Sequence, residues 1–595
     1  MSDYNPPLRD MQFILSELAG VDEIASLPGC DEATPDLVDA ILDQAGKFAT
    51  GVLAPINRIG DQQGCRLEGE RVISPDGWKD AYTQFQSAGW IGLSLPPEFG
   101  GQGLPKLVST PVWEMWFSTN MAFAMLPQLN VGEAAAIMLA GSDALKAAFL
   151  PKLVSGEWGG TMNLTEPQAG SDLAATRTRA ETQADGTYRV FGQKIFISYG
   201  EHELTSNIIH LVLARLTDAP SGVKGISMFL VPKYLVNPDG SPGARNDVRC
   251  ISIEHKMGIH GSPTCTMSYG DNVGAVGYLV GERNRGLEYM FVMMNEARFG
   301  VGLQGVGLGE RAYQQALGYA RERVQGRDAV TGENGQPIVH HPDVKRMLLS
   351  MRARIMAARA LLYTAAGWFD RAHHHPDAAV ADKCRRYVDL LMPVAKGWCT
   401  EVGNEVCDTA IQINGGMGFV EETGVAQYFR DARIITIYEG TTGIQANDLI
   451  GRKILREGGA TLIELAADMR ETALRLAADE MLSSLGAALL EDIATLERTL
   501  EWILSNGRAH LDWVLSGAVP FLHLLGTVCG GWQMGRAALA AQAGLEAGKG
   551  DADYLQGIVD LSRFYFGHIA PHSAAWARTV MCGGESVSGH DCMAL

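Results

Sequence analysis

The stretch RDARIITIYEGTTGIQ, residues 430–445, places one acidic residue, Glu439, between an apolar run and the turn-forming sequence Gly-Thr-Thr-Gly. A carboxylate among apolar side chains is hard to ionise, so its pKa rises toward the range that suits a general base. The glycines allow backbone amides to approach a ligand closely. The alternative is a solvated glutamate at the end of a helix, and the other motifs of the chain decide between these interpretations.

Composition limits the possible functions. The chain has 595 residues, enough for several domains, and its formal net charge of -19 disfavours nucleic acid and anionic membranes as partners. The ten cysteines include no C-x-x-C pair, so neither a zinc ribbon nor a dithiol redox motif is indicated, and we expect no metal site. The N-terminus lacks a basic and apolar signal, which favours reduced thiols and a cytoplasmic protein.

One apolar segment raises the question of a membrane. Trp513 to Ala541 is apolar, but Pro520, His523 and Arg536 interrupt it. A spanning helix needs about 20 mostly apolar residues. We therefore predict a buried helix pair and no membrane association.

Periodicity divides the chain into five parts. Residues 1–35 are punctuated by Pro and Gly and are predicted to be irregular, whereas residues 36–157 repeat apolar residues at helical spacing. Residues 158–283 contain short runs rich in β-formers between turn residues. Long helical patterns return at 284–456, and 457–595 is Ala- and Leu-rich and helical, with an irregular tail from Met581. The predicted fold class is mainly α with a central β domain.

Three further motifs contain residues that suit ligand binding. NLTEPQAGSDLAA at 163–175 supplies small and hydroxyl residues around a glycine, and GQKIFIS at 192–198 places an aromatic and a hydroxyl on one face of a strand. QINGGMGF at 412–419 has two adjacent glycines at a helix end, which allow close approach of a pyrophosphate. Taken singly, they are also compatible with a turn, a packed strand and a helix C-cap.

Taken in order, these motifs, with YEGT at 438–441, PEFGG at 97–101 and RERVQGR at 321–327, resemble the acyl-CoA dehydrogenase family. The resemblance covers roughly residues 40 to 455. It implies a helical domain, a β-barrel-like domain and a four-helix bundle, to which 457–595 adds a C-terminal helical domain. It also implies an FAD enzyme that desaturates an acyl-CoA thioester between its α and β carbons.

The resemblance also implies roles for individual residues. Glu439 is the expected base that removes the α-proton while the flavin takes the β-hydrogen, and its backbone N–H is expected to polarise the thioester carbonyl. Phe196 stands where many members have Trp, and Ser198 where they have Thr. The expected FAD-binding residues are Leu164, Thr165, Phe196, Ser198, Arg323, Gln325, Gln412, Gly416 and Thr441. The expected substrate-binding residues are Ser171, Asn295, Arg298 and Tyr438.

A second glutamate competes for the role of base. Some members carry the base on the helix that here contains Asn295 to Phe299, at the position before the arginine. That position is Ala297 in this chain, and Glu296 lies about 100° away around the helix. We therefore favour Glu439.

Partners and substrate follow from the same resemblance. The matches at Arg323, Gln325, Gln412 and Gly416 imply FAD binding across a subunit interface, hence a homodimer or a dimer of dimers, and an electron-transferring flavoprotein or similar acceptor. The extension looks most like a bacterial branch that oxidises 3-(methylthio)propanoyl-CoA in dimethylsulfoniopropionate breakdown. An enzyme for short or medium acyl chains, or an acyl-CoA oxidase, is the near alternative.

A different class of function is a DNA-associated or protective flavoprotein with vestigial activity. It would need a basic surface on the added domain, whereas acidic residues are frequent there: Glu464, Asp468, Glu471, Asp479, Glu480, Glu491 and Asp492. Two other features are expected to be structural. Glycines 302, 305, 307 and 309 indicate a close helix contact, and His373 to His375 a solvated turn.

Overall fold

The computed structural model describes residues 4–328 and 330–590, which form two compact units. The bundle unit comprises the described residues up to Gly46, Pro105–Ser118 and those from Val301 onward. The sheet unit comprises Lys47–Leu104 and Thr119–Gly300. The helical content is 63%, so the predicted class, mainly α with a β domain, is confirmed.

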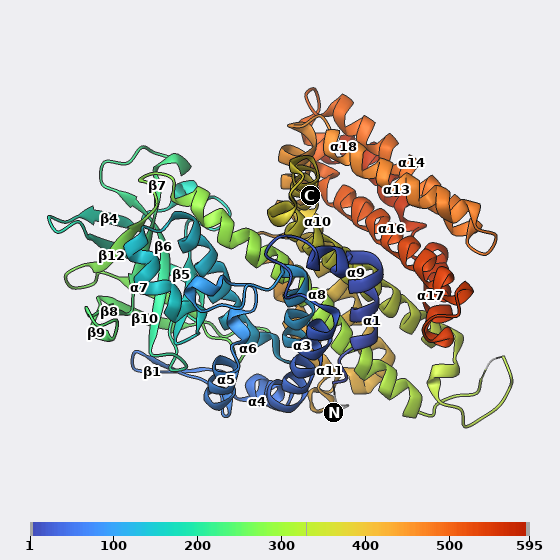
Figure 1. Ribbon diagram of the computed structural model, residues 1–595, viewed down its shortest axis with the longest axis horizontal. Helices are drawn as coiled ribbons and strands as arrows, with labels where there is room; N and C mark the ends of the chain where they lie inside the picture. Colours follow the sequence, from blue (N-terminus) through green and yellow to red (C-terminus); the bar gives the residue numbers. More distant parts are fainter. Residues whose placement is uncertain (1–3, 329, 591–595) are drawn as a thin grey trace. The chain divides into compact units, whose positions relative to one another are not determined.

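The sheet unit is built around one eight-stranded sheet, drawn in cyan to green in Figure 1. The strand order is β10-β11-β5-β12-β7-β6-β3, and β4 pairs with both β5 and β6. β3 pairs with β6 in parallel, whereas β7 pairs with its neighbours β6 and β12 antiparallel. The bounds are β3 Trp158–Asn163, β4 Arg179–Thr182, β5 Tyr188–Ser198, β6 Asn207–Leu216, β7 Ile226–Pro232, β10 Val248–Ile253, β11 Thr264–Tyr269 and β12 Ala275–Val280.

Helices complete this unit. They are α4 (Ala54–Gln63), α5 (Trp78–Ser87), α7 (Asp143–Val154) and the second half of α6 (Lys106–Ala140). The predicted helical region also contains a small hairpin that we did not predict, β1 (Arg66–Glu68) with β2 (Arg71–Ile73). Its two strands are only three residues long, which is too short to give a recognisable alternation.

α6 is interrupted at Asn120, whose backbone is not helical. The Asn120 side chain accepts a hydrogen bond from the N–H of Phe123, as an N-cap does, so a new helix begins there. Among the described residues, α6 is the one helix long and apolar enough to cross a membrane, and 67% of its most apolar window is buried. The segment Trp513–Ala541, which raised this question in the sequence, does not pass the same test.

The bundle unit has long helices at its centre. They are α8 (Gly286–Glu322), α9 (Pro342–His374) and α10 (Ala378–Asn414), followed by α11 (Val425–Ala432) and α12 (Thr442–Asp448), which continues as a π-helix over Leu449–Leu455. A Cβ on Gly302 or Gly305 would overlap the carbonyl oxygen of Ala395 or Cys399 on α10. The predicted close helix contact is confirmed for Gly302 and Gly305, and Gly307 lies close to the backbone of α6, whereas the neighbours of Gly309 are at ordinary contact distance. Among the described residues, no group of acidic, His or Cys side chains could hold a metal ion.

The N-terminal extension is helical, so the prediction of an irregular segment is wrong. It forms α1 (Leu8–Phe13), a π-helix over Ile14–Ala19, and α2 (Val21–Ala25). Prolines 6 and 7 precede the first helix and Gly20 ends the π-helix, so these residues mark helix ends rather than loops. The extension is bound to the bundle, since Asp10 accepts hydrogen bonds from Arg352 and from the Tyr554 hydroxyl.

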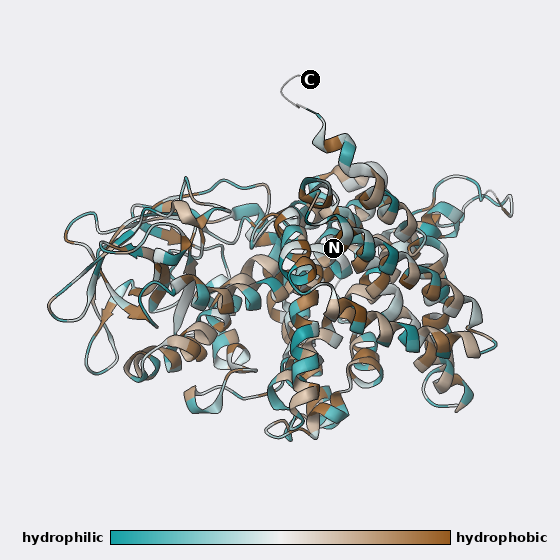
Figure 2. Ribbon diagram, turned by 90° about the horizontal axis from the view of Figure 1, so that it is seen from above, coloured by the Kyte–Doolittle hydropathy of each residue, from teal (hydrophilic) through white to brown (hydrophobic). Residues whose placement is uncertain are grey.

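The C-terminal helices form a group within the bundle unit (Figure 1, orange to red). They are α13 (Ala460–Ala478), α14 (Ser483–Asn506), α15 (Leu511–Ser516), α16 (Ala518–Glu546), α17 (Ala552–His568) and α18 (His572–Ser588). The predicted irregular tail is therefore helical up to Ser588, and 591–595 lie outside the described residues. Across the molecule, helices mix apolar and polar residues along their length (Figure 2). α16 packs on α10, with Leu522 against Gly397.

Candidate active site

The predicted base lies in a strained turn of the bundle unit. A 3-10 helix over Arg433–Thr436 ends just before it, and α12 begins just after it. Glu439 has a φ of 56° and Gly440 a φ of 91°, so two successive residues occupy the left-handed region. Such a conformation costs a non-glycine residue about 1–3 kcal/mol, and residues held in it are found more often than average at functional sites. We call Tyr438–Thr441 the Glu439 turn; Glu439 is half-buried in it.

Buried donors bind the backbone of the Glu439 turn. The ammonium of Lys396, on α10, donates to the carbonyl of Gly440 at 2.6 Å, and the amide of Gln445, on α12, donates to the carbonyl of Glu439 at 3.0 Å. Neither side chain has exposed surface. The hydroxyl of Thr441 caps α12 by accepting a bond from the N–H of Ile444 at 3.3 Å.

Tyr438 lies beside the base. Its hydroxyl donates to the side-chain oxygen of Gln304 on α8. Burial, and then the negative charge of Glu439, raise the pKa of Tyr438 well above its usual value. Tyr438 therefore stays neutral at physiological pH.

Among the described residues, the sheet unit contains four non-glycine residues with a left-handed backbone, Phe196, Tyr199, Ile259 and Asn284, of which Phe196 lies in β5 and is a predicted site residue. The register pairs Ile197 with Cys265 and Lys194 with Met267, so Ile195 and Phe196 together oppose one residue of β11. At this β-bulge Phe196 has a φ of 60° and its residue surface is 58% exposed. Ile197 is buried and Ser198 half-buried, so Phe196 and Ser198 keep the predicted alternation. We call Ile195–Phe196 the Phe196 bulge.

The bulge changes the direction of Lys194. In a regular strand Lys194 and Phe196 would share a face, whereas here Lys194 is fully buried. Its ammonium donates to the carboxylate of Glu166 at 2.8 Å and to the carbonyl of Leu164 at 2.9 Å. The N–H of Ile195 also donates to the carbonyl of Thr165 at 3.0 Å. Lys194 and Ile195 thus attach the predicted flavin loop, Leu164–Thr165, to the strand that bears Phe196.

Electrostatics make the Glu166–Lys194 pair an ion pair over a wide pH range. Burial opposes ionisation of Glu166, but the charge and hydrogen bond of Lys194 lower its pKa to about 2. Burial lowers the pKa of Lys194 to about 8, against the opposing effect of Glu166. Glu166 also accepts bonds from the backbone N–H groups of Arg177 and Thr178 at 2.7 and 3.0 Å, which satisfies its oxygens.

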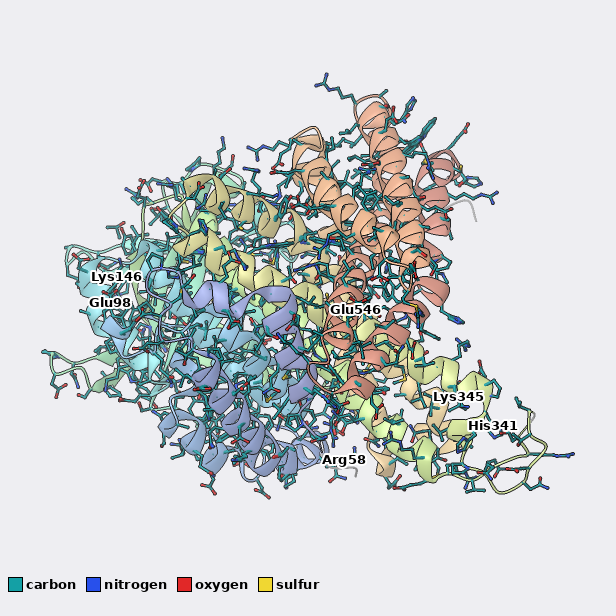
Figure 3. All side chains as sticks on the ribbon, turned by 45° about the vertical axis from the view of Figure 1, so that its right-hand side comes forward. Arg58, Glu98, Lys146, His341, Lys345 and Glu546 are labelled. Carbon is teal, nitrogen blue, oxygen red and sulfur yellow. The ribbon has the colours of Figure 1, made fainter. Side chains whose placement is uncertain are left out.

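The other predicted residues lie in two groups. In the bundle unit Arg323, Gln325, Gln412 and Gly416 are all exposed, and the Arg323 guanidinium donates to the Gln325 side chain at 3.1 Å. Arg323 and Gln325 follow the end of α8, and the ring of His341, just before α9, is hydrogen-bonded to the carbonyl of Gln325 at 2.8 Å. His341 and Lys345 are labelled in Figure 3. In the sheet unit Leu164 and Arg298 are buried, Thr165 is half-buried, and Ser171 and Asn295 are exposed.

The two candidate bases belong to different units. Glu296 is half-buried on the first part of α8, within the sheet unit, whereas Glu439 belongs to the bundle unit. Of the two, Glu439 is the residue with a left-handed backbone. The roles expected for the individual site residues stay predictions.

The residues present fit an FAD. Phe196 offers an exposed aromatic face of the kind that a planar ring system stacks against. At Gly415 and Gly416 there is open space where a Cβ would stand, so a pyrophosphate can approach the backbone. Ser198 adds a hydroxyl donor two residues from Phe196.

Sequence reasoning missed four buried residues: Glu166 and Lys194, which lie next to Phe196 in the sheet unit, and Lys396 and Gln445, which bind the Glu439 turn in the bundle unit. Glu166 and Lys194 lie within two of the motifs, but an expected turn and an expected strand gave no reason to pair them. Lys396 could have been found from the sequence, because it is the only charged residue in the apolar run from Leu390 to Cys399. A lysine in such a run is expected to be buried and bonded.

Comparison with known proteins assigns the family. Family models match the N-terminal (36–157), middle (161–272) and C-terminal (284–455) domains of acyl-CoA dehydrogenase, and an acetyl-CoA dehydrogenase C-terminal like domain (465–591). The 3-methylmercaptopropionyl-CoA dehydrogenase of Ruegeria pomeroyi is 47% identical over 98% of this chain and 99% of its own. A butyryl-CoA dehydrogenase of Syntrophomonas wolfei is 38% identical over 79% of this chain and 78% of its own.

A solved structure is similar over nearly the whole length. The acyl-CoA dehydrogenase of Bacillus anthracis, complexed with FAD, has a TM-score of 0.75 and 23% identity, covering 96% of this chain and 92% of its own. This likeness concerns the fold and includes the C-terminal helices. With the family models and the identity of its relatives, it establishes that the chain belongs to the acyl-CoA dehydrogenase family and is an FAD-dependent oxidoreductase acting on acyl-CoA.

Proposed function

We propose that Glu439 is the general base that removes the α-proton of the acyl-CoA thioester. The observation that supports this assignment is the left-handed conformation of Glu439, maintained by buried donors from α10 and α12. Strain of this kind persists only where the surrounding structure over-determines it. Glu439 as a residue is half-buried, which suits a base that must be shielded from full solvation and still reach a weakly acidic C–H.

The neighbouring groups assist proton removal. The backbone N–H of Glu439 is our candidate donor to the thioester oxygen, where negative charge develops as the proton leaves. Tyr438, neutral and bonded to Gln304, borders the acyl chain. When bound, FAD accepts the two electrons and the β-hydrogen. Leu164, Thr165, Phe196, Ser198 and Thr441 would hold it, with Ser171, Asn295 and Arg298 toward the substrate.

The exposed group supports a proposal for the assembly. Arg323, Gln325, Gln412 and Gly416 lie at the surface of the bundle unit, where they are available to an FAD bound by a second copy of the chain. We therefore propose a homodimer or a dimer of dimers, working in the cytoplasm with an electron-transferring flavoprotein or a similar acceptor. We also propose the five-part division at residues 35, 157, 283 and 456.

The substrate we favour is 3-(methylthio)propanoyl-CoA, oxidised to 3-(methylthio)acryloyl-CoA in dimethylsulfoniopropionate breakdown. The support is the 47% identity to the 3-methylmercaptopropionyl-CoA dehydrogenase, which extends through the C-terminal helices. A short-chain acyl-CoA is the second candidate, because a butyryl-CoA dehydrogenase is 38% identical over 79% of the chain.

A series of kcat/KM values distinguishes these substrates. The purified holoenzyme is assayed with 3-(methylthio)propanoyl-, butanoyl-, octanoyl- and a branched acyl-CoA, using an artificial electron acceptor. We expect the highest kcat/KM for the methylthio thioester. A clear preference for butanoyl- or octanoyl-CoA would refute this substrate while leaving the reaction intact.

A further inference from the structure

Lys396 is buried in the bundle unit close to the proposed base. Lys194 and Lys396 are the lysines without exposed surface in the described part of the chain. A buried ammonium loses its hydration, so it is retained only where protein groups replace the water. For Lys396 one of these groups is the carbonyl of Gly440, at 2.6 Å, the residue that follows Glu439.

Buried side chains bind the backbone carbonyls of Glu439 and of the next residue, Gly440. Lys396 binds the carbonyl of Gly440, and Gln445 binds that of Glu439. Rotation of either peptide toward an ordinary right-handed conformation would break a bond to a buried donor, which is unfavourable because the donor has no water to replace it. A Cβ on Gly440 would also lie 2.8 Å from the Gln445 amide, so the turn has little freedom.

The position of Lys396 is itself constrained from two sides. On one side a Cβ on Gly302 of α8 would overlap the carbonyl of Ala395, the residue before it. On the other side a Cβ on Gly397 would lie 2.5 Å from the side chain of Leu522, on α16. Because α8 and α16 pack this closely on α10, the backbone that carries Lys396 has little room to shift.

We propose that Lys396 is a positioning residue for the Glu439 turn. With Gln445, it fixes the strained backbone that aims the Glu439 carboxylate at the α carbon, and the contact between α16 and α10 makes the C-terminal helices part of this support. The proposal rests on the proposed role of Glu439. It assigns Lys396 no contact with substrate or FAD.

The test is Lys396→Met in the full-length holoenzyme, with butanoyl-CoA and 3-(methylthio)propanoyl-CoA as substrates. Methionine has similar length and no donor. We expect kcat to fall on the order of 10- to 100-fold, as for a misplaced catalytic group, with KM and FAD content unchanged. Amide hydrogen exchange in 438–445 becomes faster while α9 stays protected. The control is Lys383→Met, which replaces a partly exposed lysine of the same helix. We expect it to leave kcat, KM, FAD content and amide exchange unchanged.

The results for K396M and E439Q distinguish a failure of the role proposed for Lys396 from a failure of the role proposed for Glu439. An unchanged kcat in K396M overturns the proposal, and so does a loss of FAD with unchanged exchange in 438–445. If K396M does not fold, Gln445→Met decides, because the proposal requires a lower kcat and faster exchange in the same segment. E439Q is assayed in parallel. If E439Q stays active, the proposed base is wrong; if E439Q is inactive and K396M is not impaired, only the role of Lys396 is wrong.

Discussion

Phe196 in the sheet unit and Glu439 in the bundle unit share a left-handed backbone, but the protein maintains the two conformations differently. Phe196 lies in a β-bulge, between residues that pair with β11 on both sides. Glu439 lies between two helices, where no ladder is present, and side chains from α10 and α12 bind its turn. Each case includes a fully buried lysine, Lys194 or Lys396, bonded to a backbone carbonyl.

The two residues differ in how far their left-handed backbone depends on a few side-chain hydrogen bonds. At Phe196 the backbone ladder and the Glu166–Lys194 ion pair support one another, so the bulge is part of the fold of the sheet unit. At Glu439 the support comes from individual donors, so its geometry can change without unfolding the helices. We therefore expect changes around Phe196 to act mainly on stability, and changes around Glu439 mainly on rate.

The largest expected effect is the loss of the base itself. Glu439→Gln keeps the size of the side chain and removes the charge, so turnover falls on the order of 10²- to 10⁴-fold, with thermal stability close to wild type. The measurement is steady-state turnover of butanoyl-CoA with an artificial acceptor. Glu296→Gln is the matched control and retains activity. Full activity in E439Q with loss in E296Q would exchange the two assignments.

The next largest effect is expected from removing the Glu166–Lys194 ion pair, which supports the Phe196 bulge. Glu166→Gln leaves the buried ammonium of Lys194 without its carboxylate, which costs about 3–5 kcal/mol. The expected result is a lower unfolding temperature of the sheet unit and weaker binding of FAD to the apoprotein, measured by calorimetry and flavin fluorescence. The double variant K194M/E166Q recovers part of the stability because it removes both charges. Wild-type stability in E166Q would show that the pair is not structural.

A smaller effect is expected on stability at low pH. The folded pKa of Glu166 is about 2, below the ordinary value of 4.5, so its ionisation stabilises the fold above pH 4.5 and this contribution disappears as the pH falls toward 2. We expect the stability difference between wild type and E166Q to shrink over that range. Urea unfolding at several pH values measures it. A difference that stays constant from pH 5 to pH 3 would contradict the lowered pKa.

The sequence predicted the elements with long patterns better than the geometry of the site. The long helices and the central strands follow from periodicity, and the motifs lead to Phe196 and Glu439. The π-helix and short helices before residue 35 were missed because prolines and glycines mark both loops and helix ends. The bulge could not be predicted from GQKIFIS, since it depends on how β11 pairs with it. The bond from Lys396 to Gly440 joins residues 44 positions apart, which only the packing of α10 brings together.

The central claim is that Glu439 takes the α-proton, and deuterium exchange tests it without turnover. A thioester with sulfur in place of the β carbon has an α-proton that can leave but no β-hydrogen to transfer. Incubated with the holoenzyme in D₂O, it is analysed by mass spectrometry for deuterium at the α carbon. We predict exchange with wild type and E296Q and none above background with E439Q. Exchange at the wild-type rate in E439Q would contradict the account.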